Sequence, residues 1–260
     1  MRKPEGERTP ITIKDPYALA QNQREVQAHF RQSEEAGKNK YDFGQVEAFE
    51  PYDEAPMSRT FQATLLFDNA THSDILQQVI DPLFMASERS KVELLFAGGS
   101  LEPAHTSLYK AAAPAGMSTE ETQEEIDKLL GNSKLPMIRT ALINRSFTLN
   151  RLVLTDKAII LRTDEDSLGA LELSYKARET MDGVLRHADS KLTPDGLRKI
   201  THISIARFKE PATPRAQIKF MDIANKTVAH IRNYPITMTI ADVTFGTTLQ
   251  NTQTRPGLVK

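Results

Sequence analysis

Two short runs of this sequence carry side chains that can do acid–base chemistry: His105-Thr106-Ser107-Leu108 and His202-Ile203-Ser204-Ile205. Of the six histidines, only these two have a hydroxyl side chain two positions further on. Residues two apart in an extended strand project from the same face, so each run would place an imidazole beside a hydroxyl. Two such strands brought together supply two proton-transfer groups and two neutral hydrogen-bond donors, which is the set that reaction at a phosphodiester needs.

A histidine-x-serine pattern is short and also arises by chance. The context of the two runs argues against coincidence, because both lie in segments expected to form strands and both occupy the same place in a repeated unit. The first half of the chain is expected to hold a strand over 60–67, a helix from 73 to about 89, a motif strand near 105–110 and a helix from 118, where Ser118-Thr119-Glu120-Glu121 resembles a capping box. The second half is expected to hold a hairpin of strands over 147–154 and 157–162, a helix over 168–187, a motif strand over 200–208, a helix over 214–231 and a strand over 236–245. Each half thus runs strand, helix, motif strand, helix, strand, which predicts two pseudo-symmetric lobes.

Composition narrows the classes of protein that this chain can belong to. It has 260 residues, 39% of them hydrophobic, a formal net charge of −1 and no cysteine. Disulfides, thiol nucleophiles and thiolate metal sites are therefore excluded, and the near-neutral charge argues against a protein that coats nucleic acid. No apolar run approaches the ~20 residues of a membrane span, and the start lacks the apolar stretch of a signal peptide. We therefore expect no membrane partner and a cytoplasmic location, with a polar, partly helical extension over 1–55 and a tail over 251–260.

The two runs resemble the paired histidine-x-Thr/Ser-x motifs of the 2H phosphoesterase superfamily, which includes 2′-5′ RNA ligase-like proteins and cyclic nucleotide phosphodiesterases. The resemblance covers about residues 60–246, and the second run is the better match. Thr106 departs from the pattern because an apolar residue is usual there, and both runs use serine where threonine is commoner. The resemblance implies an α+β, bilobal, pseudo-two-fold fold over 56–250, with two antiparallel-rich sheets flanking a central cleft and helices outside. The lobes are expected at about 56–140 and 141–250.

The resemblance also implies a reaction. One of His105 and His202 would take a proton from water or a ribose hydroxyl while the other protonates the leaving oxygen, and an imidazole suits both roles because its ordinary pKa is ≈ 6.5. Ser107 and Ser204 would donate hydrogen bonds to the phosphate oxygens. No metal or other cofactor is implied. The expected substrates are 2′,3′-cyclic phosphate or 2′-5′ bonds of RNA ends or small nucleotides, with reversible 2′-5′ ligation as a further activity.

Two alternatives remain open at this point. The chain could be a non-catalytic RNA-end or nucleotide-binding module of the same fold. Alternatively, the two motifs are coincidental and the protein is a scaffold that acts through its polar N-terminal helix. The residues also leave open which histidine is acid and which is base.

Residues beside the motifs are candidates for binding the substrate. Strict alternation places Tyr109 on the face of His105, where it would stack on a base or close the pocket wall, or else be an ordinary half-buried tyrosine. By the same rule Arg207 points away from His202, and it becomes a phosphate ligand only if the strand bulges or ends near Ala206. Three further arginines would form either a basic rim or a solvated strand face: Arg145, Arg151 and Arg162.

Overall fold

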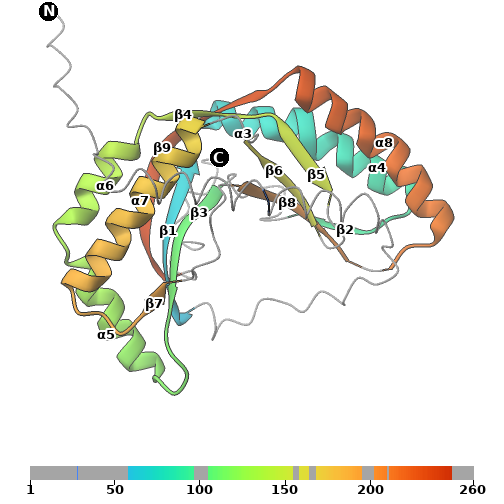
Figure 1. Ribbon diagram of the computed structural model, residues 1–260. Coiled ribbons are helices and arrows are strands. Elements are labelled where there is room, and N and C mark those ends of the chain that lie inside the picture. The colour runs from blue at the N-terminus through green and yellow to red at the C-terminus, as the bar shows by residue number, and fades with distance from the viewer. Residues whose placement is uncertain are drawn as a thin grey trace, which may run out of the picture.

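The computed structural model describes residue 28 and residues 58–96, 105–154, 158–163, 168–194, 202–209 and 211–247. Within these residues the chain is an α+β protein with two antiparallel sheets, as predicted, and the helices lie on the outer sides of the sheets (Figure 1). The expected N-terminal extension, apart from residue 28, and the expected tail lie outside the described residues. No described helix has the length and apolar character needed to cross a membrane.

The first sheet has five strands in the order β4-β9-β1-β3-β7, and the second has four in the order β2-β8-β6-β5. The strands of the first sheet are β1 (Thr60–Phe67), β3 (His105–Ala112), β4 (Ser146–Leu149), β7 (Thr193–Pro194) and β9 (Ile236–Thr247). Those of the second are β2 (Leu94–Phe96), β5 (Arg151–Leu154), β6 (Ala158–Arg162) and β8 (His202–Phe208). Each sheet therefore contains one motif strand, β3 in the first and β8 in the second.

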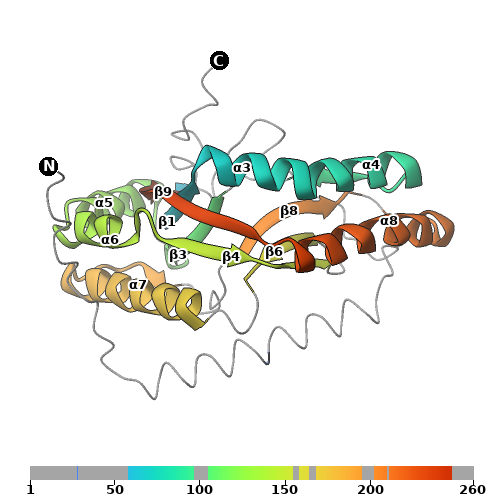
Figure 2. The same ribbon diagram turned by 90° about the horizontal axis from the view of Figure 1, so that it is seen from above.

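Helices cover the two sheets from opposite sides (Figure 2). They are α3 (Asn69–Ile75), continued by a π-helical segment (Leu76–Ile80) into α4 (Asp81–Ser90), then α5 (Thr119–Leu130), α6 (Lys134–Leu142), α7 (Leu168–His187) and α8 (Pro214–Asn233). Helix α7 packs against β3, whereas α4 and α8 pack on each other and α8 packs against β5. The predicted capping box at Ser118 is confirmed, since its side chain accepts from the Glu121 amide and the Glu121 carboxylate accepts from the Ser118 amide.

Two predicted element boundaries are wrong. The first helix begins at Asn69 rather than Ser73, because Asp68 caps it by accepting a hydrogen bond from the Thr71 amide at 2.8 Å. The predicted strand over 147–154 divides at Asn150, since β4 joins β9 in the first sheet while β5 pairs with β6 in the second. Apolar residues continue from β4 into β5, so the sequence pattern gives no sign that the pairing partner changes.

The predicted lobes, one for each half of the chain, do not match the sheets. The first sheet takes β4, β7 and β9 from the second half, and the second sheet takes β2 from the first half. Each motif strand does pair with an earlier strand of its own half, β3 with β1 and β8 with β6. The two sheets therefore do not divide between residues 140 and 141, although the repeated strand pair is present.

The core holds both motif strands in place. One cluster of buried apolar side chains includes members of both sheets and of the helices on each side. Leu108 of β3 and Ile203 and Ile205 of β8, the aliphatic residues of the two motifs, are at most 3% exposed. In the second sheet, Phe208 packs edge-to-face against Phe220 of α8 with ring centroids 6.0 Å apart. Packing of this kind fixes the backbone from which the polar side chains project.

Candidate active site

The two motif strands have the same pattern of burial. Solvent reaches the first, third and sixth residues of each strand, whereas the second, fourth, fifth and seventh are buried. The accessible residues are His105, Ser107 and Lys110 in β3 and His202, Ser204 and Arg207 in β8. Each motif thus presents its histidine and serine on one face, as predicted. The two consecutive buried residues that follow each serine show that simple alternation stops there.

A β-bulge interrupts β3 directly after the serine. Ser107 lies opposite Thr64 of β1, whereas Tyr109 lies opposite Ala63, so Leu108 is an extra residue without a cross-strand partner. A bulge residue moves everything after it to the opposite face from the one that alternation gives. Tyr109 therefore turns away from the motif histidine and serine.

Tyr109 is consequently not placed where the sequence predicted it. Its side chain is buried, and its hydroxyl donates a hydrogen bond to the Asp182 carboxylate of α7 at 2.6 Å. Burial, followed by the carboxylate beside it, raises the pKa of this phenol well above its ordinary value. The prediction that Tyr109 shares the face of His105 is wrong, and the side chain that takes that place is Lys110, opposite Gln62.

Strand β8 has a bulge at the equivalent position. Ser204 lies opposite Ile160 of β6 and Ala206 lies opposite Ile159, which leaves Ile205 as the extra residue. The condition under which Arg207 turns toward the motif face is therefore met. Because Arg207 lies opposite Ala158, it projects on the same side as Ser204.

The three arginines of the predicted basic rim lie in different environments. Arg162 lies directly opposite His202 and Arg151 lies opposite Arg162, so both belong to the histidine's row across the second sheet. Arg162 is nevertheless fully buried and its Nη1 donates to the Thr163 carbonyl at 3.1 Å. Arg145 precedes β4, and its Nε donates to the Ala141 carbonyl at 3.3 Å. The rim is therefore not formed by these three side chains together.

The two motif strands meet at their first residues. The Thr106 hydroxyl of β3 donates to the backbone carbonyl of His202 at 2.5 Å, and β3 and β8 are in contact. Among the described strands, β7 pairs only with the end of β3 and β2 only with the end of β8, so each motif lies at the edge of its sheet. Both histidines thus lie within one residue of the contact that joins the sheets. The contact also gives the polar side chain of Thr106 a defined partner.

Ser107 has a partner that the sequence did not indicate. The side-chain amide of Gln62, on β1, donates to the Ser107 hydroxyl oxygen at 2.5 Å and to the Thr64 hydroxyl at 2.9 Å. Gln62 and Thr64 are both buried. Since the serine oxygen accepts from Gln62, its own proton remains available to donate to another group.

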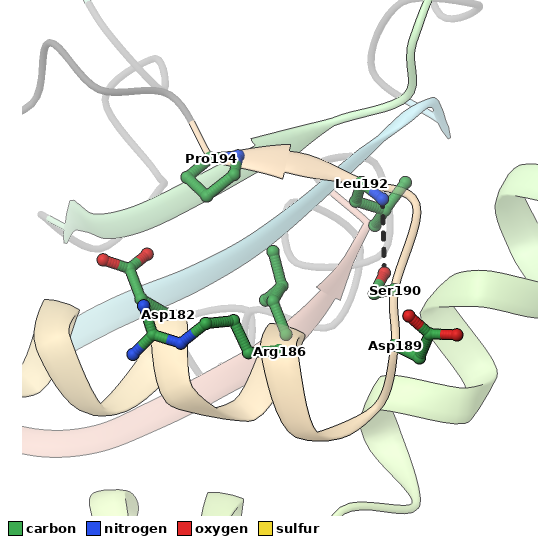
Figure 3. Close-up of a pocket in the computed structure, with 7 residues that line it drawn as sticks. Asp182, Arg186, Asp189, Ser190, Leu192 and Pro194 are labelled. Atoms are coloured by element: carbon green, nitrogen blue, oxygen red, sulfur yellow. Dashed lines mark hydrogen bonds between the residues drawn. The ribbon is translucent and has the colours of Figure 1, made fainter.

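A cavity of about 450 Å³ lies between the end of α7 and β7, lined by Asp182, Leu185, Arg186, Asp189, Ser190, Leu192 and Pro194 (Figure 3). Asp182 links it to Tyr109, on the face of the first sheet that is turned away from the motif side chains. The cavity is therefore separate from the motif residues. No group of three or more histidine, aspartate or glutamate side chains suited to a metal occurs in the part of the chain that the structure describes.

No protein-family model and no curated protein sequence matches this chain. Among solved structures, the PDE domain of MHV ns2 aligns with a TM-score of 0.36 and 12% identity, over 58% of this chain and 85% of its own. Usb1 of Kluyveromyces marxianus aligns with a TM-score of 0.37 and 11% identity, over 74% of this chain and 100% of its own. The structure of the same Usb1 with uridine monophosphate gives 0.39 and 12%, over 74% and 99% of the two chains.

Proposed function

We propose that this protein is a metal-independent phosphodiesterase that cleaves 2′,3′-cyclic phosphate or 2′-5′ bonds of RNA ends or small nucleotides. The observation that carries the proposal is the hydrogen bond from Thr106 to the His202 carbonyl, which joins the starts of two strands with the same accessible series of histidine, serine and cation. Two histidines that each lie within one residue of this contact fit a reaction in which one proton is removed and another is supplied.

Each side chain has a distinct part in this reaction. One of His105 and His202 takes the proton of water or a ribose hydroxyl as its oxygen attacks phosphorus, and the other gives a proton to the oxygen that leaves. Ser107 and Ser204 donate to the non-bridging oxygens, where negative charge grows in the transition state. Arg207 binds the same phosphate through its guanidinium. The two imidazoles carry both proton transfers, so the mechanism does not call for a metal.

The test is turnover by the purified full chain of 2′,3′-cyclic nucleotides, 2′-5′ linked oligoadenylate and RNA with a cyclic-phosphate end, with and without EDTA. We expect turnover that EDTA leaves unchanged. The rate should follow a bell-shaped pH profile, because one imidazole must start neutral and the other protonated.

Substitutions test the roles of the two histidines. His105→Ala and His202→Ala should each lower kcat by about 10²-fold or more, and the double variant should be scarcely slower than either single one. Ser107→Ala and Ser204→Ala should cost less. The control is His187→Ala, a histidine at the end of α7 and outside both motifs, which should be as active as the wild type. Full activity in either motif variant, activity restored only by a divalent metal, or nucleotide binding without turnover would each refute the proposal.

A further inference from the structure

The twin bulges bring a cation onto the motif face of each strand. Lys110 and Arg207 each lie three residues after the motif serine, and each is accessible although simple alternation would bury it. In both strands the residue before the cation, Tyr109 or Ala206, is the one turned into the core. The bulge therefore brings the third residue after the serine onto the motif face in both strands, so Lys110 of β3 is the counterpart of Arg207 of β8.

The register places Lys110 at a defined distance from the serine. Ser107 lies opposite Thr64 and Lys110 lies opposite Gln62, so the two are separated by two positions on β1. Two positions along a strand correspond to about 7 Å. Since Gln62 donates to the Ser107 hydroxyl, the serine and the lysine project over the same part of the first sheet.

The order of the accessible side chains along β3 shows on which side of the reacting phosphate Lys110 would lie. The contact between the motif strands lies at Thr106, and from it the accessible side chains follow in the order Ser107, then Lys110. Lys110 is therefore further from the junction than the serine is. The side chain of Lys110 therefore starts about 7 Å beyond that of Ser107 along the sheet, which is comparable to the spacing between neighbouring phosphates of an extended oligonucleotide.

We propose that Lys110 binds the phosphate of the nucleotide next to the scissile bond, so that an oligonucleotide end is a better substrate than a mononucleotide. This inference rests on the proposed function and names the substrate class for that site. A lysine ammonium acts on a phosphate as a flexible point charge, which suits a flanking phosphate that need not be held in one orientation. The guanidinium of Arg207 can instead hold the reacting phosphate in a fixed geometry.

The experiment compares two dinucleotides that end in the same 2′,3′-cyclic phosphate. One has a normal internucleotide phosphate, and the other has an uncharged methylphosphonate in its place. The wild type should favour the charged dinucleotide in kcat/KM by roughly ten-fold, the scale of one hydrogen bond to a charged group. Lys110→Gln should abolish this preference, change turnover of the mononucleotide little, and make log kcat/KM for the charged dinucleotide less dependent on log salt by about one slope unit. Lys110→Arg should restore most of the preference.

Controls separate this inference from the proposed function. Lys226→Gln removes an exposed lysine of α8 and should leave the preference intact. Binding of both dinucleotides is also measured in His105→Ala, with and without Lys110→Gln, so that this measurement does not depend on turnover. Turnover with the same preference in wild type and Lys110→Gln overturns the inference alone. Binding that depends on Lys110 and on the internucleotide charge, without turnover by the wild type, supports the inference and overturns the proposed function.

Discussion

At the scale of single residues, Ser107 shows how a side chain outside a motif sets what the motif can do. The Gln62 amide is fixed by two acceptors, the Ser107 and Thr64 hydroxyls, on the motif face of the first sheet. Because Gln62 supplies the serine with a donor, the serine proton is left for a substrate oxygen. Without Gln62, the Ser107 hydroxyl would be able to rotate and donate its proton to a neighbouring acceptor instead.

Gln62→Leu is therefore expected to lower kcat by about ten-fold, similar to Ser107→Ala, because supporting hydrogen bonds of this kind fix the orientation of a reacting group. Steady-state kinetics on any substrate that the wild type turns over measure the effect. The Ser107→Ala, Gln62→Leu double variant should be no slower than Ser107→Ala alone. Additive losses would show that Gln62 acts on something other than the serine.

At the scale of elements, the bulges decide which side chains meet the substrate. The extra residue of β3 leaves its carbonyl outside the ladder with β1, and the Nε of Arg178 on α7 donates to this Leu108 carbonyl at 3.0 Å. Helix α7 also holds Tyr109 through Asp182. One helix thus binds two consecutive residues at the bulge.

Arg178→Met is expected to destabilise the protein by about 1–3 kcal/mol, the cost of leaving a buried carbonyl without its donor. Denaturant unfolding measures this free energy. The matched control is Arg215→Met, which removes an exposed arginine at the start of α8 and should change stability by less than about 0.5 kcal/mol. Equal stability of the two variants would show that the bulge does not depend on Arg178.

At the scale of the whole molecule, the two sheets are interleaved rather than consecutive. Helix α7, from the second half of the chain, covers β3 of the first sheet, and α4, from the first half, packs with α8 of the second half beside the second sheet. Neither half can therefore form its sheet and its helical layer alone. The motif strands are held together directly by the Thr106 hydroxyl and the His202 carbonyl.

Thr106→Val keeps the shape of the side chain and removes that hydrogen bond between the sheets. We expect a loss of about 0.5–1.5 kcal/mol in stability and a larger relative loss in kcat, about ten-fold, because small misplacement of reacting groups is costly. Unfolding curves and steady-state kinetics give the two quantities. Thr140→Val, an exposed threonine of α6 whose hydroxyl donates to the Pro136 carbonyl of its own helix at 2.9 Å, is the control for the loss of a hydroxyl. A Thr106 variant as fast as wild type would show that the bond does not set the distance between the motifs.

The sequence by itself determined those features that depend on neighbours along the chain. Strand β1, the capping box at Ser118 and helix α7 were predicted with the bounds or contacts that the structure has. The accessible pair of histidine and serine in each motif was also predicted, because side chains two apart share a face wherever a strand is regular.

Tertiary structure decided the rest of the candidate site. Three features of the site depend on which residue of a partner strand lies opposite. Lys110 rather than Tyr109 lies on the motif face, Arg207 turns toward the side of Ser204, and Gln62 bonds to Ser107. A bulge depends on the hydrogen bonds to that partner strand and on the helix behind it. The pattern of apolar and polar residues along one strand gives information about neither. For the same reason, the order of strands and helices repeats along the two halves of the chain, although each sheet combines strands from both halves.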